Sequence, residues 1–159
     1  MSDTTVRTEH LTDRSEVNHA TVVLRDGMHF EGFTSDPDGK RFAIQLDADP
    51  ESGGQGQGIR PVKMLLVSLA GCMAMDVVSI LRKKRQAVTG FEVGISGDQA
   101  PDHPMVYTDI RLTFKVTGRA VDPAAVERAI QLSYDKYCPV ANLLKPVVPI
   151  HTRYEIVEG

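Results

Sequence analysis

Cysteine is scarce in this 159-residue sequence, which has two, and tryptophan is absent. Two cysteines cannot form the several disulfides that hold small secreted domains together, so the fold must depend on a packed core. With 42% apolar residues, one domain of this length can build such a core. Histidine is also scarce, and the five histidines show no ligand spacing with one another or with the cysteines. We therefore expect no metal and no other cofactor.

The chain has no excess of positive charge, since 18 basic residues face 21 acidic ones and the net charge is −3. This balance argues against a surface that binds nucleic acid or an anionic membrane. Residues 1–16 are polar and contain no apolar segment of the signal-peptide kind, so we expect the protein to be cytoplasmic. That compartment is reducing and disfavours a permanent disulfide, so the cysteines are either packing residues or chemically active.

No uninterrupted apolar run reaches the roughly 20 residues that cross a bilayer. The longest apolar-rich segment, Met64–Leu81, is interrupted by Ser68 and Asp76. It belongs to a helix that we predict from Pro61, a residue suited to the first helical position, to about residue 85. Because this helix is apolar nearly all round, we expect it to be buried on several sides and not to lie in a membrane.

Strand patterns precede and follow this helix. Asp26–Gly27 between apolar residues is a strong hairpin signal, and Asp122–Pro123 is a typical helix start. The predicted elements are strands at 17–24, 28–33 and 42–46, a helix at 61–85, strands at 91–95 and 110–116, helices at 123–137 and 139–144, and a strand at 150–157. This order lacks regular strand–helix alternation, so we predict an α+β fold. We treat 1–16 as a disordered arm and 17–159 as a single domain.

The two cysteines have different local surroundings. Cys72 lies on the predicted central helix, in a stripe of small polar residues that includes Asp76 one turn away. A buried carboxylate needs a partner, and its charge would raise the pKa of Cys72. Cys138 precedes Pro139 and should cap a short helix, whose N-terminus would lower the pKa of Cys138. Passive packing of both cysteines stays open as an alternative, since free cysteine is commonly buried.

Two segments carry a family resemblance. Pro61–Leu81, with Gly71–Cys72 at its centre, and Leu132–Val140, around Cys138, resemble the two cysteine motifs of the OsmC/organic-hydroperoxide-resistance (OsmC/Ohr) family. The resemblance extends from about residue 18 to the C-terminus. It implies antiparallel strands around a long central buried helix, and an intertwined homodimer with the thiols at the subunit interface.

The same resemblance implies a chemistry, the thiol-dependent reduction of organic hydroperoxides. In that scheme Cys72 attacks the peroxide, Cys138 resolves the sulfenic acid to a disulfide, and an external dithiol restores both thiols. Peroxidases of the family also use an arginine from the N-terminal strands, for which Arg25 is the candidate and Arg60 the alternative. Their helix-start glutamate is absent here, since Val62 and Lys63 follow Pro61.

Other interpretations stay open, and the absent glutamate motivates the first two of them. One is a non-catalytic OsmC-like dimer that binds an apolar ligand or senses redox state at the subunit interface. A second keeps the enzyme but lets Asp76 hold the cation beside Cys72. A third is phosphate binding by the glycine-rich loop at 51–58, which lacks the Gly-Lys-Ser/Thr ending of a phosphate-binding loop.

Overall fold

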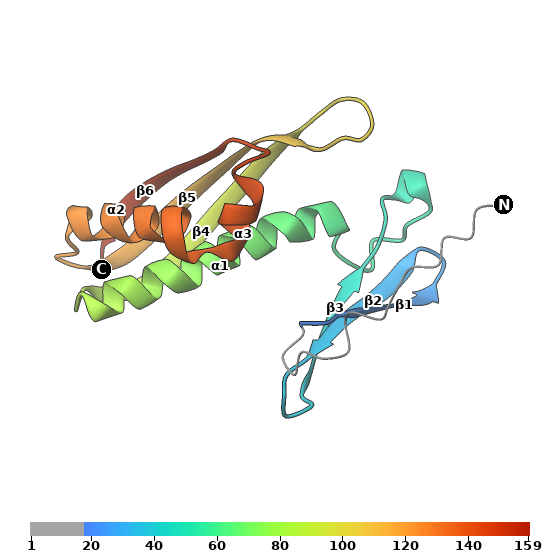
Figure 1. Cartoon of the computed structure of the whole chain (residues 1–159), viewed down its shortest axis with the longest axis horizontal. Helices are drawn as coiled ribbons and strands as arrows, with labels where there is room; N and C mark the ends of the chain where they lie inside the picture. Colours follow the sequence, from blue (N-terminus) through green and yellow to red (C-terminus); the bar gives the residue numbers. More distant parts are fainter. Residues whose placement is uncertain (1–17) are drawn as a thin grey trace. The chain divides into compact units, whose positions relative to one another are not determined.

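The computed structural model describes residues 18–159, and the chain divides into two compact units, of which Pro61 ends the first and Val62 begins the second. Figure 1 shows one three-stranded sheet in each unit. The predicted arm at 1–16 lies outside the described residues. The assignment of 17–159 to a single domain stays a prediction.

The first unit is an antiparallel sheet of three sequential strands. It consists of β1 (Thr21–Asp26), β2 (His29–Ser35) and β3 (Arg41–Leu46), in the order β1-β2-β3, followed by the one-turn helix η1 (Pro50–Ser52). Gly27 adopts a positive φ of 53° between β1 and β2, which glycine tolerates without strain. The hairpin predicted at Asp26–Gly27 is therefore confirmed.

The glycine-rich loop after β3 folds around the carboxylate of Asp47. The backbone N–H groups of Ala48, Gln55 and Gln57 donate to this carboxylate over 2.8, 3.0 and 2.9 Å. At Gly54 a Cβ atom would lie 1.8 Å from the carbonyl oxygen of Ala48, so only glycine allows this close approach of two backbones. The loop is thus organised by a buried carboxylate within the chain itself.

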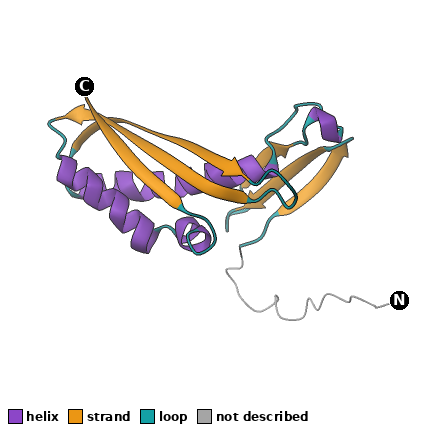
Figure 2. Ribbon diagram, turned by 90° about the horizontal axis from the view of Figure 1, so that it is seen from above, coloured by secondary structure: helices purple, strands orange, loops and turns teal. Residues whose placement is uncertain are grey.

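The second unit places its helices on one face of a three-stranded sheet (Figure 2). Its elements are α1 (Pro61–Lys83), β4 (Ala87–Gln99), β5 (Tyr107–Arg119), α2 (Pro123–Leu132), the π-helix η2 (Ser133–Tyr137), α3 (Pro139–Leu144) and β6 (Ile150–Glu158). The sheet order is β4-β5-β6. β4 and β5 are antiparallel, whereas β6 runs parallel to β5 because the helical crossover returns the chain to the same end of the sheet. The α+β class is confirmed.

Apolar side chains from α1, β5 and α2 form the core of the second unit. Along β5, alternate residues from Ile110 to Val116 are almost completely buried, as expected for a strand with one covered face. The buried residues of α1 are Leu69, Ala70, Met73, Val77 and Leu81. From Ala70 on they follow at intervals of three and four residues, and Leu69 lies four residues before Met73, which places all of them on one side of the helix. This packing fixes the position of α1 relative to the sheet of its own unit.

The opposite side of α1 is apolar but exposed. Met75 is 75% exposed and Val67 50%, so the expectation that the helix is buried on several sides is not met within this chain. The reason is geometric, since the second unit provides a sheet on one side of α1 only (Figure 2). By length and composition α1 would be able to cross a membrane, but core helices of soluble proteins satisfy the same criterion.

Candidate functional site

Three potentially reactive side chains converge in the second unit. Cys72 and Asp76 lie one turn apart on α1, and Cys138 lies at the start of α3. The two sulfur atoms and a carboxylate oxygen of Asp76 are all within 4.8 Å of one another. Both cysteines are free thiols, with Cys72 half-buried and Cys138 buried. The fold therefore brings together the two cysteines that the sequence singled out.

Hydrogen bonds on both sides hold Cys138 in place. Its N–H donates to the carbonyl of Ser133 over 2.9 Å, and its own carbonyl accepts from the side-chain amide of Asn142 over 2.9 Å. Its sulfur accepts from the N–H of Ala141 over 3.3 Å, which is the N-capping contact of α3. The predicted helix-capping position of Cys138 is thus confirmed.

The acidity predicted for Cys138 is wrong. Burial and a hydrogen bond with Cys72 raise the pKa of Cys138 to about 11, and the N–H of Ala141 only partly offsets this. The six-residue helix α3 is too short for its dipole to compensate for the loss of water around a completely buried sulfur. Because this pKa lies far above neutral pH, Cys138 keeps its proton.

Asp76 has a partner that the sequence did not reveal. The hydroxyl of Ser133, which is completely buried, donates to Asp76 Oδ2 over 2.9 Å. This contact confirms that the carboxylate on the polar stripe is satisfied. Because the carbonyl of Ser133 also holds the N–H of Cys138, Ser133 connects α1 to the backbone that carries Cys138. Ser133 has the small polar side chain that such a contact needs, but its pairing depends on a π-turn that the helical pattern does not predict.

The two candidate arginines lie in the first unit, and each has a carboxylate partner there. Arg25, at the end of β1, forms an ion pair with Glu31, which also pairs with Arg41 over 3.1 Å. The hydrogen bond from Arg25 is the main reason that the pKa of Glu31 lies below its usual value. Arg60 forms an ion pair with Asp49. A role for Arg25 beside Cys72 stays a prediction.

The glycine-rich loop is a poor phosphate site for a specific reason. The backbone N–H groups of Gln55 and Gln57, which would bind a phosphate, already donate to Asp47. The N–H of Gln57 is the main cause that lowers the pKa of Asp47, so this carboxylate is ionised at neutral pH and repels a second anion. The loop therefore binds an internal anion in place of an external one.

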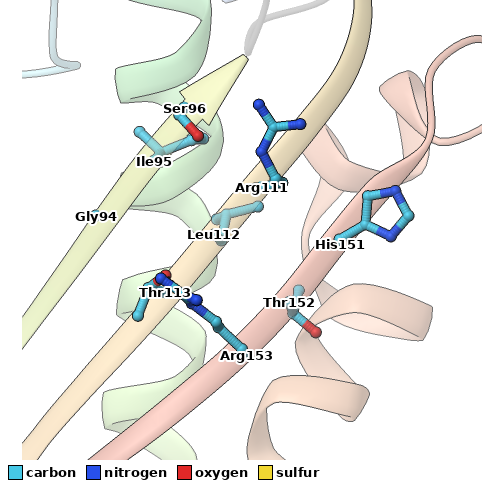
Figure 3. Close-up of a pocket in the computed structure, with 9 residues that line it drawn as sticks. All are labelled: Gly94, Ile95, Ser96, Arg111, Leu112, Thr113, His151, Thr152 and Arg153. Atoms are coloured by element: carbon cyan, nitrogen blue, oxygen red, sulfur yellow. The ribbon is translucent and has the colours of Figure 1, made fainter. Parts of the chain in front are cut away.

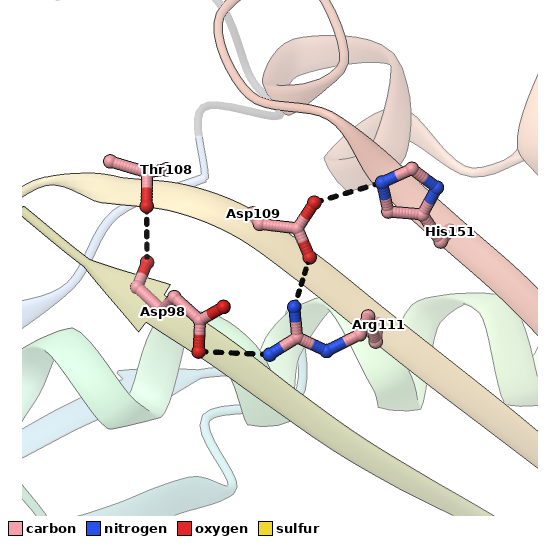
Figure 4. Close-up of polar contacts among 5 residues, drawn as sticks. All are labelled: Asp98, Thr108, Asp109, Arg111 and His151. Atoms are coloured by element: carbon pink, nitrogen blue, oxygen red, sulfur yellow. Dashed lines mark hydrogen bonds and ion pairs between the residues drawn. The ribbon is translucent and has the colours of Figure 1, made fainter.

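A second polar feature covers the sheet face that points away from the helices. A shallow hollow of about 490 Å³ is lined there by the side chains of Arg111, His151 and Arg153, among others (Figure 3). These charges are largely paired: Arg111 donates to Asp98 over 2.8 Å and also pairs with Asp109, and His151 contacts Asp109 over 2.8 Å (Figure 4).

Hydroxyl groups of Ser96, Thr113 and Thr152 line the hollow on this sheet face, but no thiol and no carboxylate does. The Arg111–Asp98 and His151–Asp109 pairs join neighbouring strands, and the hydrogen bond from Arg111 lowers the pKa of Asp98 as a structural ion pair does. The cluster of Cys72, Asp76 and Cys138 is therefore the stronger candidate for chemistry.

The sequence and the fold have recognisable relatives. The family described as OsmC-like protein matches residues 54–153, a range that includes both cysteines but not Arg25. The protein YhfA of Escherichia coli K12 is 43% identical over 113 residues, which are 71% of this chain and 83% of YhfA.

Solved structures share the fold over most of the chain. A hypothetical protein from Aquifex aeolicus VF5 is 28% identical with a TM-score of 0.76, over 91% of this chain and 98% of that one. An organic hydroperoxide resistance protein OsmC from Legionella pneumophila has a TM-score of 0.64 at 14% identity, over 89% and 98% of the two chains. The latter similarity concerns the fold alone.

Proposed function

Since this chain belongs to the family of OsmC-like proteins, we propose that it reduces organic hydroperoxides with the thiols of Cys72 and Cys138. One observation carries the proposal: two free cysteines distant in sequence have their sulfur atoms within 4.8 Å. Some proteins with this fold are named for organic hydroperoxide resistance, among them those from Legionella pneumophila and Bacillus subtilis. Both names agree with a thiol-based reaction at this pair.

The reaction proceeds in two balanced steps. The Cys72 thiolate attacks one peroxide oxygen, the O–O bond breaks, and the leaving alkoxide takes a proton to become an alcohol while Cys72 becomes a sulfenic acid. The sulfur of Cys138 then attacks Cys72, its proton and the hydroxyl leave as water, and a disulfide forms. An external dithiol reduces this disulfide and is itself oxidised, which completes the cycle.

The surroundings of the two sulfurs suit different roles. Cys72 is half-buried, so a peroxide can reach it. Cys138 is completely buried and keeps its proton, so it is protected until Cys72 has been oxidised. This division of roles favours Cys72 as the attacking residue and Cys138 as the resolving one.

We also propose that the protein acts as a cytoplasmic homodimer. The exposed apolar side of α1, with Val67 and Met75, is a large surface that water solvates poorly. A second copy of the chain would cover it without any other partner. A cytoplasmic location would supply the reducing conditions and the dithiol that free thiols of this kind need.

The test uses the reduced full-length chain and one equivalent of cumene hydroperoxide. We expect loss of both thiols, a Cys72–Cys138 disulfide in the peptide map, and repeated turnover when dithiothreitol is supplied. Cys72→Ser should abolish the reaction, whereas Cys138→Ser should stop at a sulfenic acid that dimedone traps. If both thiols of the wild-type chain remain titratable after peroxide treatment, the proposal is wrong.

An observation in the first unit favours a second candidate, the binding of an apolar ligand. A pocket of about 270 Å³ there is lined almost entirely by apolar side chains. Its lining residues are Val22, Met28, Phe30, Leu46, Asp47, Ala48 and Pro61. If a single equivalent of peroxide oxidises the thiols but no turnover follows, and an apolar fluorescent dye binds in a manner that Met28→Asp prevents, this candidate is favoured over the enzyme.

A further inference from the structure

We propose that Cys72, Asp76 and Cys138 form a binding site for a thiolate-preferring metal ion of the zinc type in the reduced protein. The two sulfurs and one carboxylate oxygen would be the protein ligands, and a fourth position would stay open to water. This proposal does not depend on peroxide reduction, since it concerns the reduced protein before any oxidant is present.

The spacing of the three ligand atoms suits a tetrahedral ion. Zinc binds thiolate at about 2.3 Å and carboxylate at about 2.0–2.2 Å, so ligand atoms around it lie roughly 3.5–3.8 Å apart. The present atoms are all within 4.8 Å of one another. Because Cys72 and Asp76 are half-buried, small side-chain rotations can close the remaining difference.

The elements that carry the ligands are fixed before any ion binds. Cys72 and Asp76 are four residues apart on α1, so both project from the same side of one helix. Cys138 is held by its N–H bond to Ser133 and by the N–H of Ala141 at its sulfur. A site on preorganised elements binds an ion without the cost of ordering flexible segments.

Two further hydrogen bonds suit the ligands themselves. The hydroxyl of Ser133 donates to Oδ2 of Asp76, which orients the carboxylate and leaves it further lone pairs for an ion. The N–H of Ala141 points at the sulfur of Cys138 and would stabilise the negative charge of a metal-bound thiolate. Such supporting contacts to each ligand are typical of metal sites in proteins.

The donor set selects the class of ion. Two thiolates prefer Zn²⁺ or Cu⁺, whereas Mg²⁺ and Ca²⁺ prefer sites made of oxygen alone. Three protein ligands with an open position are typical of a reactive or exchangeable site, because structural zinc sites have four. This ligand set contains no histidine, so the histidine spacing considered in the sequence does not bear on it.

A bound ion would regulate the proposed peroxidase, and this consequence alone rests on the proposed function. The ion occupies the sulfur lone pairs that would attack a peroxide, so the loaded protein should react more slowly. When oxidation does occur, two thiolates and one hydroperoxide take up two protons and give a disulfide, an alcohol and water, and the ion is released. Zinc and hydroperoxide would thus compete for the same pair of thiols.

The test is a titration of the reduced full-length chain with Co²⁺ under argon, without peroxide. We expect one equivalent to bind with thiolate-to-cobalt charge-transfer absorption and the intense d–d bands of tetrahedral cobalt, and Zn²⁺ to remove both signals. Cys72→Ser and Cys138→Ser should each lower the affinity at least about 100-fold, and Asp76→Asn about 10-fold or more. The matched control, Asp135→Asn, removes an exposed carboxylate three residues before Cys138 in the sequence and should leave affinity and spectrum unchanged.

The outcomes separate the two proposals. Absence of the tetrahedral thiolate spectrum in the wild-type chain overturns the metal site, whatever the variants do. An Asp76→Asn chain that binds as tightly as Asp135→Asn removes the carboxylate from the ligand set and also contradicts the site as proposed. A chain that is oxidised by cumene hydroperoxide but binds no Co²⁺ refutes the metal site alone, whereas Co²⁺ binding without any oxidation refutes the peroxidase alone.

Discussion

The two three-stranded sheets of this chain differ in what their own units provide to cover them. In the second unit, helices cover one face of the sheet, and the completely buried side chains of Phe114 and Leu69 belong to one continuous core. In the first unit, Gly32 and Asp47 are the buried residues among positions 18–61, while Val22 remains 56% exposed. The second unit therefore has the core of an ordinary small domain, and the first has an apolar sheet that needs cover from elsewhere.

This difference also separates the chemistry. The thiols of Cys72 and Cys138 belong to the second unit, where packing fixes their positions. Arg25, the cation that we expect beside them, belongs to the first unit. Polar groups determine the local structure of the first unit more than packing does, as the carboxylate of Asp47 shows. The following predictions test how far the two units differ in stability, assembly and reaction.

The largest effect should come from equivalent phenylalanine truncations in the two sheets. Phe114→Ala removes a completely buried ring and should lower the free energy of unfolding by about 3–5 kcal/mol. Phe42→Ala removes a ring that is 51% exposed and should cost less than about 1 kcal/mol. Chemical denaturation of both variants measures this contrast. Equal losses would show that the first sheet is as well covered as the second.

A charge on the exposed side of α1 should weaken the proposed dimer. Met75→Glu places a carboxylate on a surface that a second copy would bury, so we expect the dimer dissociation constant to rise about 100-fold, or about 2.7 kcal/mol. Sedimentation equilibrium measures it, with Lys83→Glu as a control at the exposed end of the same helix. An unchanged constant in Met75→Glu would mean that this side of α1 is not an interface.

Arg25 tests whether the first unit takes part in the reaction. If its guanidinium stabilises the thiolate or the leaving alkoxide, Arg25→Ala should lower kcat/KM for cumene hydroperoxide about 10-fold, which is about 1.4 kcal/mol. Glu31→Gln keeps Arg25 but removes the negative charge that pairs with it, and should lower the rate less than Arg25→Ala does. A rate for Arg25→Ala equal to that of the wild type would confine the chemistry to the second unit.

The smallest effect concerns acid and the loop around Asp47. The folded pKa of Asp47 lies below its unfolded value, mainly because the N–H of Gln57 donates to it. The stabilisation is therefore complete above the unfolded pKa of about 4 and is lost as the pH falls through the folded value. Hydrogen exchange of the peptide 48–58, corrected for intrinsic rates, should show lower protection at pH 3 than at pH 6. Asp47→Asn should remove this pH dependence, and its persistence would contradict the explanation.

Much of the fold follows from local chemistry that the sequence makes visible. Asp122 accepts a hydrogen bond from the N–H of Ala124 over 3.0 Å, as expected for a helix cap before Pro123. The predicted helix from Pro61 ends at Lys83, two residues before the expected end. In each case a capping residue, a proline or a turn glycine restricts the backbone, and no distant contact is needed.

Features that depend on distant contacts were not predictable in this way. The parallel pairing of β6 with β5 depends on the direction in which the crossover returns, and that direction is not encoded in residues 150–158. The contact between Asp76 and Ser133 joins residues 57 positions apart. The pKa of Cys138 was misjudged because burial and Cys72 outweigh the cap that the local sequence reveals. The sequence thus identified the two cysteines, and the packing determines the pKa of Cys138.

The bridge formed by Ser133 has a kinetic consequence. Its hydroxyl holds α1 and its carbonyl holds the N–H of Cys138, so two contacts that involve neither sulfur help to maintain the separation of the two sulfurs. Each thiol then has a very high effective concentration relative to the other, because folding has already restricted the motion that would otherwise separate them. Once Cys72 has been oxidised, formation of the disulfide should be a rapid first-order event that a dissolved thiol cannot outcompete.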